Sequence, residues 1–206
     1  MRNQFYDLGT KYGFGWNEKH SNQVIKLGHQ LYEKVVAVGL LPRLSTGEKQ
    51  VLQDAGYVHD VGRSPKAVGE GEHNDKSVTT LKKELGSTLC AEGHTQLVLY
   101  CVGHHRGEEW KKLAADKEVP ADLLGDAKRL CGIFRIADAL DYGRQERVNG
   151  ITLTLEGRKL TCKLFPRDAR ASTAIAGDEK IRAKKKSDLF REAFALKEVD
   201  FEIAEG

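Results

Sequence analysis

Apolar residues recur every three or four positions along the first two thirds of the chain, as they do in helices that bury one face. This spacing predicts a helix over residues 17–38, with Val24, Leu27 and Leu31 on its apolar face. A second helix is predicted to begin at the capping-box sequence Ser45-Thr46-Gly47-Glu48 and to run to about residue 60. The remaining helices are predicted near residues 73–85, 94–105 and 120–138, with loops over 63–72 and 106–119.

The pattern changes after residue 149. Ile151, Leu153 and Leu155 alternate with polar residues, and a second alternating run follows a Glu156-Gly157 turn, which predicts a β-hairpin. A helix over residues 178–195 and a strand over residues 199–203 complete the predicted elements. The expected fold class is therefore mainly α, with a helical bundle domain over residues 1–148 and a small α+β subdomain over residues 149–206. Because about sixty residues rarely hold a core alone, the subdomain should pack on the helical part.

The composition is that of an ordinary globular chain. Its 206 residues are 40% hydrophobic and 31% charged, with a net charge of +3, which fits one main domain and provides no concentrated basic face for nucleic acid. No segment approaches the roughly 18 uninterrupted apolar residues of a membrane span, and the N-terminus lacks the apolar core of a secretory signal. We therefore expect a cytoplasmic protein with no membrane partner. The four cysteines lie far apart among apolar neighbours and are interpreted as buried free thiols.

Histidines and aspartates that could bind a metal ion are spread over separate predicted helices. The candidate ligands are His20, His59, Asp60, His73, His104, His105 and Asp138. His20 falls on the apolar face of its helix, where an imidazole points inward rather than into solvent. Imidazole and carboxylate together suit one or two divalent ions of Mn, Fe, Co, Ni or Zn, whereas Mg prefers mainly oxygen and water ligands.

The order of these residues resembles the HD superfamily of metal-dependent phosphohydrolases, whose pattern is a His, a His-Asp pair and a distant Asp. His20, the pair His59-Asp60 and Asp138 match that pattern. The extra histidines of the two-metal branch are matched by His73, His104 and His105. The resemblance implies an HD-type helical bundle in which Asp60 bridges two ions. It further implies that His20, His59 and Asp138 hold one ion, and that His73, His104 and His105 hold the other.

Along most of its length the chain is similar to one subfamily, the C-terminal HD domain of exopolyphosphatase and guanosine pentaphosphatase proteins. The matching stretches are residues 11–14, 58–62, 105–107 and 135–141. The N-terminal actin-like half of those proteins, which contains their polyphosphate active site, has no counterpart in the sequence. Exopolyphosphatase activity is therefore not transferred to this chain.

Basic residues that directly follow the candidate ligands are expected to contact a phosphate group. These are Arg63, Lys66 and Arg106, with Arg144 as a weaker candidate. Many relatives carry Lys where Arg63 stands, which keeps the charge but changes the donor geometry. Asp141 has two interpretations that the sequence leaves open: an acceptor that orients a ligand histidine, or a helix cap or salt-bridge partner.

Other conspicuous residues are given structural roles. His29 and His94 fit no motif position and are interpreted as surface or helix-end histidines. The basic run over residues 181–186 is interpreted as a solvated helix face rather than a contact for nucleic acid or polyphosphate. Trp16 and Trp110 are expected to be packing residues, although Trp110 follows His105 closely enough to help line a site.

The sequence thus predicts an enzyme that hydrolyses a phosphate ester or anhydride by a metal-activated water, with Asp60, Arg63, Lys66 and Arg106 in catalytic roles. The expected partner is a small anionic phosphate compound such as a nucleotide or an alarmone, and homo-oligomer formation is left open. The alternative is a regulatory module that keeps the metal site and binds a nucleotide or polyphosphate without hydrolysing it. An intact ligand set favours the enzyme.

Overall fold

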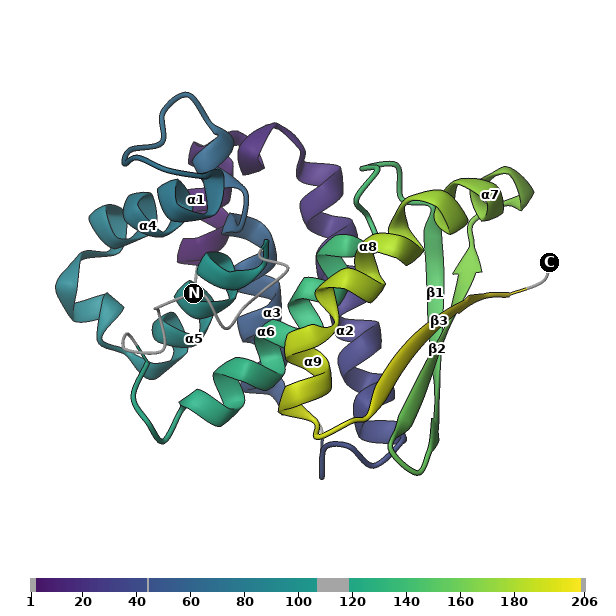
Figure 1. Ribbon diagram of the computed structural model, residues 1–206. Coiled ribbons are helices and arrows are strands. Elements are labelled where there is room, and N and C mark those ends of the chain that lie inside the picture. The colour runs from purple at the N-terminus through teal and green to yellow at the C-terminus, as the bar shows by residue number, and fades with distance from the viewer. Residues whose placement is uncertain (1–2, 44, 107–118, 205–206) are drawn as a thin grey trace.

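The computed structural model describes residues 3–43, 45–106 and 119–204, and shows a helical body with a small sheet at its C-terminal end (Figure 1). The helical body comprises α1 (Gln4–Lys11), η1 (Gly13–Trp16), α2 (Glu18–Ala37), α3 (Thr46–Val58), η2 (Val61–Arg63), α4 (His73–Cys90), α5 (Gly93–His104) and α6 (Leu124–Ala139). The C-terminal part comprises β1 (Val148–Glu156), β2 (Lys159–Pro166), α7 (Ala169–Gly177), α8 (Glu179–Lys186), α9 (Asp188–Ala193) and β3 (Glu198–Ile203). The predicted fold class, mainly α with a C-terminal α+β subdomain, is confirmed.

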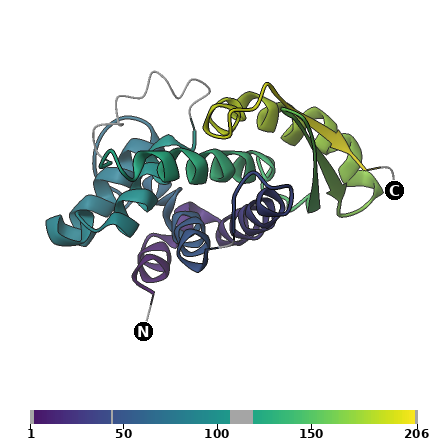
Figure 2. The same cartoon turned by 90° about the horizontal axis from the view of Figure 1, so that it is seen from below.

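The sheet has the strand order β1-β2-β3. β1 and β2 form the predicted antiparallel hairpin, in which Leu153 faces Cys162, and β3 pairs parallel to β2 with Phe201 opposite the same cysteine. The chain between β2 and β3 contains α7, α8 and α9, of which α7 and α8 pack on the sheet. Seen from below, the sheet lies at one end of the molecule and α4 lies at the other (Figure 2).

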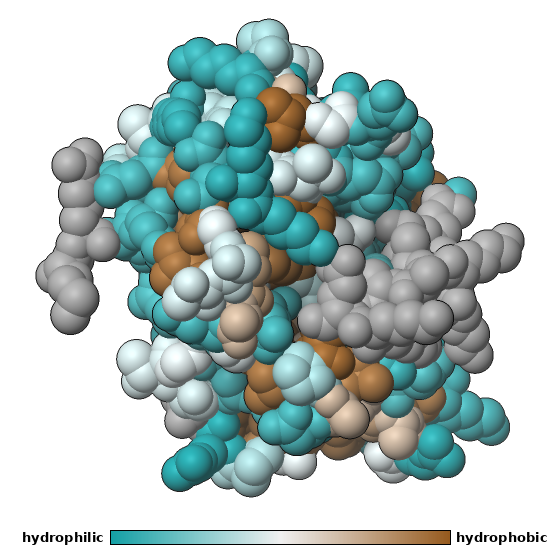
Figure 3. All heavy atoms as spheres, turned by 90° about the vertical axis from the view of Figure 1, so that its left-hand side faces the viewer, coloured by the Kyte–Doolittle hydropathy of each residue, from teal (hydrophilic) through white to brown (hydrophobic). Residues whose placement is uncertain are grey.

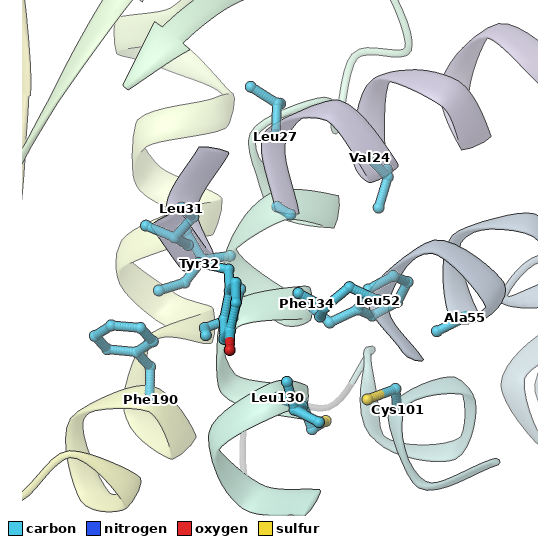
Figure 4. Close-up of a cluster of buried hydrophobic side chains, with 14 of the residues drawn as sticks. Val24, Leu27, Leu31, Tyr32, Leu52, Ala55, Cys101, Leu130, Phe134 and Phe190 are labelled. Carbon is cyan, nitrogen blue, oxygen red and sulfur yellow. The ribbon is translucent and has the colours of Figure 1, made fainter. Parts of the chain in front are cut away.

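Helix α6 is the centre of the core, because α2, α5, α8 and α9 all pack against it. Figure 4 shows Phe134 and Leu130 of α6 among side chains from α2 and α3, with Phe190 of α9 beside them. At Gly132 of α6 a Cβ atom would lie 2.8 Å from the Phe190 backbone, so α9 can approach this closely only over a glycine. The same buried cluster continues to Leu160 in the sheet, so both parts of the chain share one core.

Three predicted helix boundaries were wrong, and some short elements were not predicted. α6 begins at Leu124 rather than at Pro120, which lies in the turn before it. α4 does not stop at Gly86: that residue breaks the helical backbone with φ 74° and ψ 169°, but a further turn continues to Cys90. The single helix predicted over residues 178–195 is two helices that meet at Ser187, and α7 precedes them. Helix α1 and the turn η1 were not predicted, because each is short and its apolar positions are few.

The surface over α4 and α5 is largely hydrophilic, with hydrophobic side chains exposed between the polar ones (Figure 3). Within the described residues, no helix combines the length and apolar character needed to cross a membrane. The four cysteines are free, as predicted, and three of them are buried while Cys90 is half-buried.

Candidate metal centre

Three predicted ligands converge from α2, the end of α3 and α6. The Nε2 atoms of His20 and His59 lie 3.2 Å apart. Asp138 Oδ1 lies 3.3 Å from the His20 Nε2 atom and 3.7 Å from the His59 Nε2 atom. Ligand atoms bound at about 2.1 Å to a tetrahedral ion are about 3.4 Å apart, so this spacing fits a single shared cation. We call these three residues the inner group.

The two imidazoles of the inner group are held in one orientation by bonds to their other nitrogen. His20 Nδ1 donates to Asp141 Oδ2 at 2.8 Å, and Asp141 is fully buried. His59 Nδ1 donates to the Gly56 carbonyl at 3.0 Å. A hydrogen on each Nδ1 leaves the Nε2 lone pair of a neutral ring directed at the shared centre, as metal binding requires. The structure therefore decides the question that the sequence left open for Asp141, which orients a candidate ligand histidine.

A second set, which we call the outer group, consists of Asp60, His73 and His105. His73 Nε2 lies 3.1 Å from Asp60 Oδ1 and 3.3 Å from His105 Nε2. His105 Nδ1 donates to the Val102 carbonyl at 2.7 Å, which again leaves Nε2 free to bind a cation. The three ligand atoms all lie within 4.8 Å of one another.

Asp60 lies between the two groups. Its Oδ1 belongs to the outer group, whereas its Oδ2 lies 3.9 Å from the His59 Nε2 atom of the inner group. Only 3% of its surface is exposed. One carboxylate can offer an oxygen to each of two ions, so this position is compatible with the bridging role that the family resemblance implies.

A serine in α4 holds the chain in the turn that contains Asp60. The buried Ser77 hydroxyl donates to the His59 carbonyl and accepts from the Gly62 N–H, both at 2.8 Å. Gly62 also permits close contact with α4, because a Cβ atom there would lie 1.9 Å from the His73 carbonyl oxygen. The turn after α3 is thereby fixed against the start of α4, which brings Asp60 and His73 together.

The charge states of Asp60 and Asp138 suit metal ligands. Burial alone would raise the pKa of Asp60, but His59 and His73 beside it hold that pKa far below its usual range. Burial likewise opposes ionisation of Asp138, whose pKa Lys186 and His20 nevertheless keep well below normal. Both carboxylates are therefore ionised at neutral pH.

Burial and nearby carboxylates shift the pKa values of three candidate ligand histidines in different directions. Burial lowers the pKa of His59 and His105, so both rings are neutral at pH 7 and can offer a lone pair. Burial also opposes a charge on His20, but the carboxylates of Asp138 and Asp141 outweigh it and raise its pKa to about 9. His20 therefore carries a proton at pH 7 that a metal ion must displace.

Both groups open into one cavity of about 400 Å³. Its basic lining residues are Arg63, Arg106, Arg144, Arg182 and Lys186. Arg63 Nε and Arg144 Nη2 bind the Asp60 carboxylate at 2.8 and 2.5 Å, and Lys186 Nζ binds Asp138 Oδ2 at 2.6 Å. The cavity thus combines a candidate site for cations with a lining that favours anions.

Two predicted site residues lie elsewhere. His104 belongs to neither ligand group, and its ring packs against Tyr100 with 4.3 Å between ring centroids and 46° between the ring planes. Successive residues of a helix point about 100° apart, so when His105 faces the centre, His104 cannot. Lys66 is exposed and donates to the Lys11 carbonyl at 3.3 Å instead of lining the cavity. The predicted roles of Arg63 and Arg106 fit their positions in the cavity lining.

Sequence reasoning missed part of the lining. The basic run over residues 181–186 is not wholly a solvated face: Lys184 and Lys185 are exposed, but Arg182 and Lys186 line the cavity. Arg182 and Lys186 are four residues apart, so the sequence shows that they share one helix face. It does not show which part of the protein that face packs against. Tyr142 was also missed.

His29 and His94 belong to neither ligand group. His29 and His94 hydrogen-bond to the Lys49 carbonyl and to Asp54, in keeping with their exclusion from the site. Trp16 is 69% exposed, so its predicted packing role was wrong. Trp110 lies outside the described residues.

No family model matches the sequence, and a search of curated proteins finds no significant relative. The geometry of the two ligand groups and their cavity is therefore what points to a function.

Proposed function

We propose that the protein is a metal-dependent phosphohydrolase of the HD superfamily that cleaves a phosphate ester or anhydride. The observation that carries this proposal is the pair of ligand groups in one cavity lined by five basic side chains. Hydrolysis of a phosphate group needs ligands that hold a dication, which activates water, and basic side chains that bind the anionic substrate.

The donor set fits one or two divalent transition-metal ions. His20, His59 and Asp138 would hold one ion, and His73 and His105 would hold the other, with Asp60 available to both. Two imidazoles in each group suit Mn, Fe, Co, Ni or Zn better than Mg. Once bound, such ions supply Lewis-acid activation of water and neutralise charge on phosphoryl oxygens.

The chain's own residues support the same chemistry. Asp141 fixes the orientation of His20, and Asp60 keeps its negative charge at neutral pH. Arg63 and Arg144 lie on either side of the Asp60 carboxylate, where they can share hydrogen bonds with the oxygens of a phosphate group. Because these donors are held in place before substrate arrives, they stabilise charge that develops at phosphorus without further reorganisation.

The cavity volume of about 400 Å³ falls within the range of small-molecule sites, which favours a compact substrate over a polymer. Our first candidate for the substrate is a nucleotide or an alarmone. The cytoplasmic location of the protein stays a prediction.

Elemental analysis combined with hydrolysis of bis(p-nitrophenyl) phosphate in the presence of Mn²⁺ tests the proposal. We expect bound transition metal and measurable turnover in the wild type. Asp60→Ala should lower turnover by about 100-fold or more and remove much of the metal, because Asp60 is a ligand of the outer group and its second oxygen faces the inner group. Its helical circular dichroism should stay unchanged. Metal binding by the wild type without turnover of any phosphate ester would favour the regulatory module.

A further inference from the structure

Helix α8 brings the C-terminal part of the chain to the metal centre. It packs against α6, the helix that carries Asp138 (Figure 1). Arg182 and Lys186 lie one turn apart on α8, and both line the cavity. The Lys186 side chain is only 11% exposed and binds Asp138, so a lysine of the C-terminal part directly contacts a candidate metal ligand.

Arg182 is oriented by an aromatic ring at the cavity wall. Its guanidinium carbon lies 4.5 Å from the centroid of the Tyr142 ring, and its Nη2 donates to the Tyr142 hydroxyl at 3.2 Å. Stacking of a guanidinium on an aromatic face leaves its in-plane N–H groups able to bind an oxyanion. Tyr142 is half-exposed, so this pair lies where an incoming molecule can reach it.

A buried arginine fixes α8 relative to the metal ligands. Arg135 is fully buried in α6, one turn before Asp138. It donates to the His104 carbonyl at 3.1 Å, to the Lys186 carbonyl at 3.3 Å and to Asp188 Oδ1 at 2.7 Å. One guanidinium thus joins the end of α5, beside the ligand His105, to the end of α8 and the start of α9.

The balance of charge indicates what α8 binds. The carboxylates of Asp60 and Asp138 are each paired with basic side chains, with Lys186 on Asp138. A dication bound to those carboxylates would take up their negative charge, which leaves the paired cations Arg63, Arg144 and Lys186 in need of an anion. Lys186 is nearly buried, so solvent cannot supply that compensation as well as a bound phosphate group can.

We propose that α8 is a substrate-binding element in which Lys186 and Arg182 hold a phosphate group of the substrate, and that Arg135 is the residue that positions it. The proposal rests on the proposed function for the role of the metal centre. Under this proposal the C-terminal part of the chain contacts the substrate, in addition to its role in the packing of the core.

Binding of inorganic phosphate to the Mn²⁺-loaded protein, measured by calorimetry, tests the role of α8. Lys186→Met and Arg182→Met should each weaken phosphate binding by about tenfold, since each removes one charged contact. Lys185→Met is the matched control on the same helix, because Lys185 is exposed and outside the cavity lining, and it should change binding by less than about twofold. Lys186→Arg should restore most of the affinity that Lys186→Met loses.

Wild-type affinity in both Lys186→Met and Arg182→Met would overturn the proposal, as would a metal-loaded wild type that binds no phosphate. These outcomes are separate from failure of the proposed function, which appears as absence of ester turnover while phosphate still binds.

The positioning role of Arg135 is tested by Arg135→Met and by the milder Asp188→Asn, which keeps the arginine and its carbonyl contacts. Both should weaken phosphate binding, by about tenfold and about threefold, while the inner group keeps its metal. Arg129→Met removes an arginine from the same helix far from the cavity and should leave phosphate binding unchanged. If Arg135→Met does not fold, the phosphate affinity of Asp188→Asn decides whether Arg135 has a positioning role. A lowered melting temperature with wild-type phosphate affinity would show that Arg135 is only structural.

Discussion

The two ligand groups differ in what holds them. The inner group comes from α2, α6 and the residue after α3, and both of its imidazoles are anchored through Nδ1. In the outer group, His73 is the first residue of α4 and follows the segment 64–72, which has no regular secondary structure. Among the described residues, His73 Nδ1 has no hydrogen-bond partner, and Arg63 Nη2 approaches its Nε2 to 3.2 Å.

This difference implies two sites of unequal affinity. A ligand set that is already fixed loses little conformational entropy when a cation binds, whereas a loosely held ligand must be ordered at that moment. We therefore expect the inner group to bind its ion first and more tightly. The outer group should fill at higher metal concentration and lose its ion more readily to a chelator.

The sharpest test of this comparison removes one histidine from each group. His20→Ala should abolish tight binding, because it removes one of the three ligands of the inner group. The two ligands that remain should support only weak metal uptake. His73→Ala should lower the stoichiometry from two ions to one and leave the tight ion in place. Calorimetric titration with Mn²⁺ after removal of metal measures both. Equal losses in the two variants would contradict the ranking.

Asp141→Asn tests the anchoring itself. The change keeps the size of the side chain but removes the charge that orients His20. The affinity of the tight site should fall by about 10- to 100-fold, and that of the weak site should stay the same. The same titration reports both constants, and a drop confined to the weak site would show that the groups are wrongly assigned.

The pH dependence of metal binding should also single out the inner group. His20 has a pKa raised to about 9, so below that pH a cation must displace its proton. Affinity at the tight site should fall about tenfold for each pH unit below 9, with about one proton released per ion. Titrations between pH 7 and 9 in buffers of different ionisation enthalpy count that proton. An affinity that does not change over this range would exclude the protonated state of His20.

The smallest effect is expected at Lys66. Its side chain is exposed and bound to the Lys11 carbonyl, outside both groups. Lys66→Ala should therefore leave metal stoichiometry, phosphate affinity and turnover within about twofold of the wild type. A large loss of turnover would restore the catalytic role that the sequence predicted.

The sequence predicted the helices that carry the candidate ligands, because these residues lie on the same helix faces as the periodic apolar residues. His20 is a clear case, since it lies one turn before Val24 on the buried face of α2. Of the adjacent pair His104 and His105, the sequence could not say which residue faces the centre, because that depends on the rotation of α5 against its neighbours. The packing of α5 on α3, α4 and α6 decides it.

The contribution of α8 was beyond sequence reasoning for a different reason. Charge runs are usually solvated, and local pattern contains no information about which distant helix covers them. Lys186 becomes part of the cavity only because α8 and α9 pack on α6. Such contacts between remote segments depend on tertiary structure and not on propensity.

The close contact between Gly132 and Phe190 makes the last quarter of the polypeptide indispensable to the rest. A stop codon after residue 148 would remove α8 and α9 from α6 and expose to water the part of the core that these two helices cover. The truncated product should aggregate rather than persist as a smaller folded protein, so limited proteolysis of the intact protein should yield no stable fragment that lacks the residues after 148.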